Sequence, residues 1–103
     1  MKPANSMIVV PKGFVHHGTL PDGTDLFSNH RYSVAITLHA DGATTLISVN
    51  RRAINKTKLE EAEKVVREFG VSEFSRMIPA HRSNAIYFIV PNTLSVPKFE
   101  DNQ

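Results

Sequence analysis

Cysteine is absent from the 103 residues of this chain. Disulfides, thiolate metal sites and cysteine nucleophiles are therefore excluded, and stability has to come from the packing of apolar side chains. Long apolar runs are missing as well. The run near the start, Met7 to Val10, stops at Pro11 and is too short for a signal-peptide core or a membrane span. These absences predict a cytoplasmic protein with no membrane partner.

The length of the chain corresponds to one domain with a modest core. Hydrophobic residues make up 41% of the sequence, well above the fraction found in disordered chains. Lysine and arginine number 12 and aspartate and glutamate 10, so the formal net charge is +2. An excess this small does not by itself indicate nucleic-acid binding, and the positions of the charges matter more than their sum.

Two segments in the middle of the chain predict a β-hairpin. Residues 32–39 alternate strictly between apolar and polar side chains, as in a strand with one buried face. Asp41-Gly42 follows as a turn, and residues 44–49 are rich in β-branched side chains. An earlier hairpin is expected where residues 13–20 and 24–27 flank the turn sequence Pro21-Asp22-Gly23. Further strands are expected at 7–10 and 85–90.

One amphipathic helix is predicted over about 58–69. Its apolar residues recur at spacings of three, four and three, which places them on one stripe: Leu59, Ala62, Val66 and Phe69. Thr57 and Glu60 match a capping box at its start, and Gly70 fits the position after its end. A second, short helix is expected between Ser72 and Pro79.

These elements predict an α+β domain over residues 1–90, followed by an extended C-terminal tail over 91–103. We expect a mixed or antiparallel sheet of four or five strands, with the main helix packed on one face. The direction of strand 85–90 stays open, because a crossover and a return are both compatible with the spacing. The expected core joins the helix stripe to sheet residues Val34, Ile36, Leu38, Ile47, Val49, Ile86, Phe88 and Val90.

The sequence contains none of the common motifs of catalytic sites. His16 and His17 are adjacent, so on a strand they face opposite ways and cannot chelate one ion together. Neither a nucleophile elbow nor a glycine-rich phosphate loop occurs. His17 could meet Asp22 or Asp25 across the first hairpin, although polar loops produce such pairs by chance. We expect no enzyme, no catalytic residues, no metal and no cofactor. An acid–base enzyme would need at least two of His16, His17 and His30 in one pocket.

Positively charged residues are expected at the open end of the central hairpin, where its first strand begins and its second strand ends. Because its strands are antiparallel, residues 29–31 and 50–52 emerge at the same edge, and the predicted helix start follows closely. The candidate partner- or anion-binding residues, called the basic cluster below, are His30, Arg31, Arg51, Arg52, Lys56, Lys58 and Arg82. The alternative is a solvated surface whose cations pair with carboxylates elsewhere.

The leading hypothesis is a small, non-enzymatic binding or regulatory protein that associates stoichiometrically with a macromolecular partner. Accessory proteins and inhibitors of phages and mobile elements act in this way. The basic cluster and an exposed strand edge would make the contact, and the edge also predicts a homodimer. The alternative is nucleic-acid binding by the same cations, five of which predict a log–log salt slope of about −4 to −5. Tyr32, the aromatic residue nearest these cations, belongs to the apolar face, so no base-stacking platform is expected.

Overall fold

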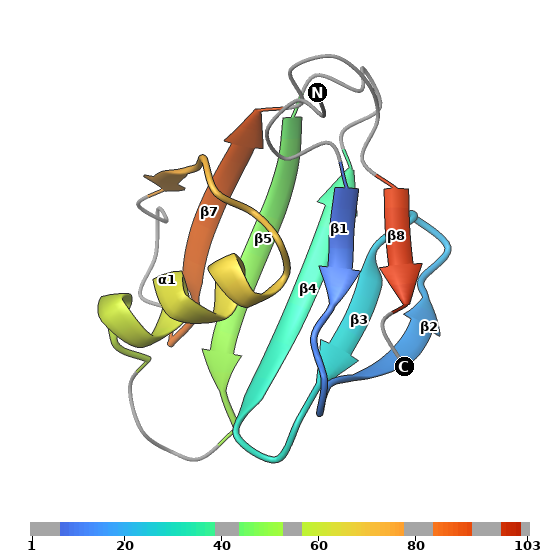
Figure 1. Cartoon of the computed structure of the whole chain (residues 1–103), viewed down its shortest axis with the longest axis horizontal. Helices are drawn as coiled ribbons and strands as arrows, with labels where there is room; N and C mark the ends of the chain where they lie inside the picture. Colours follow the sequence, from blue (N-terminus) through green and yellow to red (C-terminus); the bar gives the residue numbers. More distant parts are fainter. Residues whose placement is uncertain (1–6, 39–43, 53–56, 78–83, 92–97, 102–103) are drawn as a thin grey trace.

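The computed structural model describes residues 7–38, 44–52, 57–77, 84–91 and 98–101. Within these ranges the chain forms one helix and eight strands (Figure 1). In chain order they are β1 (Met7–Val10), β2 (Val15–Thr19), β3 (Asp25–Ser28), β4 (Tyr32–Leu38), β5 (Thr44–Arg51), α1 (Leu59–Glu68), β6 (Ser75–Met77), β7 (Ile86–Pro91) and β8 (Lys98–Asp101).

Six strands form one antiparallel sheet in the order β2-β3-β4-β5-β7-β6. Strands β1 and β8 pair in parallel as a separate two-stranded sheet. Figure 1 shows α1, β1 and β8 in front of the same face of the large sheet. One helix and an antiparallel sheet agree with the predicted α+β class, but the expected four or five strands were wrong, because the sheet has six.

The last strands differ most from the prediction. Residues 75–77 form β6 and pair antiparallel with β7, so the second helix expected between Ser72 and Pro79 was wrong. A helix of so few residues is marginal alone, whereas β7 offers a ladder of backbone partners. Phe74 also packs edge-on against Phe88, with 5.1 Å between the ring centroids. Strand β7 runs antiparallel to β5, which fixes the direction left open above.

The segment 91–103, expected to be an extended tail, contributes Pro91 to β7 and residues 98–101 to β8. Strand β8 pairs with β1 over its whole length, from Met7 opposite Lys98 to Val10 opposite Asp101. Such a pairing between distant parts of the chain leaves no local pattern in the sequence. The other residues of the predicted tail lie outside the described residues.

The core lies between the large sheet and the layer formed by α1 and β1. The expected residues Val34, Ile36, Ile47, Val49, Phe88, Val90, Ala62, Val66 and Phe69 are buried, and Leu59 and Ile86 pack against them partly buried. The prediction that Leu38 belongs to the core was wrong. Leu38 is 38% exposed at the end of β4, beyond the part of the sheet that α1 crosses (Figure 1). Core residues that the sequence analysis did not single out are Ile8, Val10, Phe14, Phe27, Val65 and Val71.

The start of α1 is held by the sheet rather than by a capping box. The N-cap is Lys58, and no side chain caps the helix, so the predicted capping box was wrong. The Thr57 hydroxyl instead accepts a hydrogen bond from the Arg51 backbone N–H at 2.9 Å. Thr57 is only 3% exposed. A buried hydroxyl therefore ties the entry to the helix to the end of β5.

Thr57→Val should destabilise the protein by about 1–3 kcal/mol, because it leaves the Arg51 N–H without its partner at a buried position. The free energy of unfolding from denaturant titration measures this. Thr44→Val makes the same change at a half-buried position of β5 and should alter that free energy by less than about 1 kcal/mol. Equal losses from the two variants would contradict the role assigned to Thr57.

Candidate functional site

The second face of the large sheet, called the open face below, carries the side chains that alternate with the core residues. They are Leu26 and Ser28 on β3, Ser33, Ala35 and Thr37 on β4, Leu46, Ser48 and Asn50 on β5, and Tyr87 and Ile89 on β7. Ser33 lies opposite both Ser28 and Asn50, and Ser48 lies opposite both Ala35 and Tyr87. In the part of the chain that the structure describes, each of these residues is half-buried or exposed. The open face is therefore a surface.

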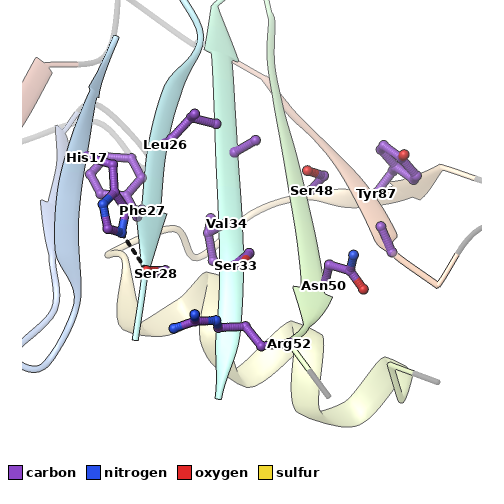
Figure 2. A pocket seen from close by; sticks show the side chains of 12 residues that line it. His17, Leu26, Phe27, Ser28, Ser33, Val34, Ser48, Asn50, Arg52 and Tyr87 are labelled. Atoms are coloured by element: carbon purple, nitrogen blue, oxygen red, sulfur yellow. Dashed lines mark hydrogen bonds between the residues drawn. The ribbon is translucent and has the colours of Figure 1, made fainter. Parts of the chain in front are cut away.

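A hollow of about 560 Å³ lies on the open face. Figure 2 shows short side chains in its middle, where Ser33 and Ser48 stand on neighbouring strands. Larger side chains flank them: His17 on one side, Tyr87 on the other and Arg52 at the end of β5. The hollow thus arises from a contrast in side-chain size on a continuous sheet.

His17 reaches the open face through an irregularity in β2. The register of β2 against β3 shifts between His16 and Gly18, as in a β-bulge. The Nε2 atom of His17 hydrogen-bonds the Ser28 hydroxyl at the edge of the hollow (Figure 2). His16 instead lies 2.8 Å from the Asp25 carboxylate and stacks on the buried ring of Phe27. Asp25 therefore pairs with His16 rather than with His17, and the two imidazoles lie on opposite faces.

Backbone and side-chain bonds bring the two ends of the central hairpin together. The backbone N–H of Arg52 donates to the Arg31 carbonyl at 2.9 Å. The side-chain oxygen of Asn29 accepts from the N–H groups of Arg31 and Tyr32 and so fixes the turn between β3 and β4. The predicted closeness of Arg31 to Arg51 and Arg52 follows from these bonds and from the pairing of Arg51 with Tyr32.

The sheet nevertheless divides the basic cluster between its two faces. Arg51 lies on the helix side, where its Nη1 atom is 3.8 Å from the Glu61 carboxylate. Arg52 lines the hollow on the open face, and its Nη1 atom donates to the Asn29 carbonyl at 3.0 Å (Figure 2). The two adjacent arginines therefore serve different surfaces.

A second hollow, of about 400 Å³, lies between the β3–β4 turn and α1. The exposed residues His30 and Arg31 line it together with Glu61, Lys64 and Glu68. Its two carboxylates weaken the attraction of this hollow for an anion. The open face, next to Arg52, is the more favourable place for a negative charge.

The remaining members of the basic cluster are only partly placed. Lys58 is exposed at the N-cap of α1. Lys56 and Arg82 lie outside the described residues. A partner- or anion-binding role for any member of the cluster stays a prediction.

The open face was not predicted from the sequence, although the alternation in β4 and β5 indicates which residues lie on it. Arg51 is paired with Tyr32, and paired residues share a face, so the burial of Tyr32 sends Arg51 to the helix side and Arg52 to the other. Tyr87 was hidden inside a continuous apolar run. Its exposure on the open face could not be inferred before the partners of β7 were known.

Among the described residues, no three histidine, aspartate or glutamate side chains gather as they would to hold a metal ion. No helix in the same part of the chain is long and apolar enough to cross a membrane. No protein-family model, curated protein or solved structure matches this chain. Its function is therefore argued from the surfaces described above.

Burial raises the pKa of the Tyr32 phenol, and its hydrogen bond to Glu61, 3.1 Å between oxygens, raises it further. A raised pKa means that the fold favours the neutral phenol. This stabilisation is present below the unfolded pKa of about 10 and is lost as pH rises through the folded pKa.

We expect phenolate absorbance to place the Tyr32 pKa above that of an unfolded tyrosine, measured in a Tyr87→Phe background that leaves Tyr32 as the one tyrosine. Glu61→Gln should lower this pKa, because it removes the carboxylate that holds the phenol proton. Glu60→Gln, an exposed change on the same helix, is the control. A pKa unmoved by Glu61→Gln would refute the assigned cause.

Proposed function

We propose that this chain is a non-enzymatic binding protein that associates stoichiometrically with a macromolecular partner through the open face and the adjoining Arg52. The observation that carries the proposal is the hollow on a sheet face that no described helix or strand covers, with a floor of short side chains at Ser33, Ala35 and Ser48. Such a floor lets another molecule approach the backbone of the two central strands closely.

The shape of the hollow favours a macromolecular segment over a small ligand. Its lining comes from strands β3, β4, β5 and β7 and from His17 on the edge strand β2, so at ~4.8 Å per strand interval it extends over roughly 19 Å of sheet. Small molecules are usually held in closed, mostly apolar clefts. Strands β3, β4, β5 and β7 are hydrogen-bonded on both sides, so this part of the surface is preorganised and little conformational entropy is lost on binding.

The placement of the histidines favours binding over acid–base catalysis. The hollow on the open face includes one of them, His17, and the hollow beside α1 includes His30. His16 lies on the other side of the sheet from His17, bonded to Asp25. The acid–base enzyme considered from the sequence would need at least two of His16, His17 and His30 in one pocket. Among the described residues, neither hollow brings two of these three histidines together.

The strand edges are less suited to the partner than the face is. One edge of the sheet is β2, whose bulge at His16–Gly18 interrupts the ladder that an added strand would follow. The other edge is β6, with only three residues. Association through an edge, including the homodimer expected from the sequence, would therefore gain few hydrogen bonds. It stays a prediction.

Site-specific photo-crosslinking in cells tests the proposal. We expect a benzophenone amino acid in place of Tyr87, an aromatic residue that flanks the hollow, to form adducts, whereas the same group at Glu68, exposed on α1, should form few. Ala35→Leu should reduce the yield from position 87, because its larger side chain fills the floor of the hollow. Adducts that form equally from both positions, or only from position 68, would contradict binding through the open face.

A further inference from the structure

Charge is distributed unevenly between the two sides of the sheet. Among the described residues that line the hollow there is one full charge, the guanidinium of Arg52, and no carboxylate. Arg52 is exposed, and its guanidinium donates a hydrogen bond to the neutral backbone carbonyl of Asn29. Helix α1 instead carries four carboxylates, of Glu60, Glu61, Glu63 and Glu68, against two cations, Lys64 and Arg67, and so has a net charge of −2. This separation directs a negatively charged partner to the open face and away from α1.

The other lining residues suit a partner with flat rings and many polar atoms. The ring of Tyr87 and the imidazole of His17 flank the hollow (Figure 2). Aromatic side chains on a sheet stack with nucleic-acid bases of any sequence. Between the rings, Ser33, Ser48 and Asn50 offer hydroxyl and amide groups that can donate to phosphates and accept from sugar hydroxyls or base edges.

We infer that the partner of the open face is a single-stranded nucleic acid, an inference that rests on the proposed function. Its phosphates lie against Arg52 and its bases stack on Tyr87. From β2 to β7 there are four strand intervals, or roughly 19 Å, enough for a few nucleotides. Binding of a neutral or basic partner would leave the Arg52 guanidinium without a counter-charge.

A duplex fits this surface poorly. Proteins read the major groove by inserting a helix or a two-stranded ribbon. The one helix in the described part of the chain carries four glutamates against two cations, and this net negative charge is unfavourable for contact with phosphates. The hollow is concave, so its short floor side chains cannot reach into a groove, whereas the exposed bases of a single strand can lie down on it.

The test is fluorescence anisotropy with the full chain and labelled oligonucleotides of about 12 nucleotides, as single-stranded DNA, single-stranded RNA and duplex, at several salt concentrations. We expect saturable binding of single strands and weaker binding of the duplex. Arg52→Gln should weaken binding about tenfold or more and make the log–log salt slope shallower by about 0.7, the contribution of one phosphate contact. Arg52→Lys, which keeps the charge, should restore most of that slope.

Arg67→Gln is the matched control. It removes the same charge from the helix side, where Arg67 lies over the ring of Phe74. We expect its affinity and salt slope to equal those of the unmodified protein. An effect as large as that of Arg52→Gln would show that only net charge matters, and it would overturn the inference.

Tyr87 provides an independent optical signal. The chain has no tryptophan and two tyrosines, so in a Tyr32→Phe background Tyr87 is the sole source of tyrosine fluorescence. Stacking on a base should quench this fluorescence as single strands bind. Tyr87→Leu should weaken binding about tenfold. Binding without quenching, and with unchanged affinity for Tyr87→Leu, would contradict the assigned stacking.

The two proposals can fail separately. If no single strand binds at low salt while position 87 still forms adducts with a protein that Ala35→Leu reduces, the partner is a protein and the inference is overturned, but the proposed function stands. If position 87 forms no adducts either, both proposals are overturned. Circular dichroism of each variant, matching that of the unmodified protein, excludes unfolding as the cause of a loss.

Discussion

Phe69 contacts three parts of the fold: α1, the segment around β1 and the large sheet. Its ring is fully buried and meets Phe14 and Phe27 edge-on, with centroids 5.0 and 5.3 Å away. Its backbone carbonyl accepts a hydrogen bond from Val9 in β1. The end of α1, the segment after β1 and strand β3 of the large sheet therefore meet at one residue. Aromatic pairs of this geometry add about 0.5–1.5 kcal/mol each beyond the burial of their area.

Because the apolar contacts gather around Phe69 on one side of the sheet, they also determine which side chains lie on the other side. The helix and the small sheet cover one face, and the opposite face carries small and polar side chains around Ser33 and Ser48 together with the apolar Leu26, Leu46 and Ile89. Strand alternation then assigns every residue to one side or the other. Because Tyr32 is buried, its partner Arg51 turns toward Glu61, and the next residue, Arg52, reaches the open face. The core thus determines which arginine is available to a partner.

Features encoded within a short stretch could be predicted from the sequence. The alternation in residues 32–38 and the helical stripe from Ala62 to Phe69 gave the right element and, apart from Leu38, the right buried side. Features that depend on distant partners could not. Ser72 and Pro79 resemble helix boundaries, yet the residues between them include β6, because β7 provides the backbone partners. Thr57 resembles a cap, yet its hydroxyl bonds to the end of β5. The hollow depends on the order of the strands and on which face α1 and the small sheet cover. No short stretch of sequence determines either of these features.

The depth of the hollow is set by side-chain volume and not by the path of the backbone. The floor residues Ser33, Ala35 and Ser48 lie on the face away from the core, so their size can change without disturbing the packing around Phe69. Under the proposed function, the residues that contact the partner and the residues that stabilise the fold would therefore lie at separate positions on the same two strands. A few substitutions on β4 and β5 would then change the partner while the core stays the same.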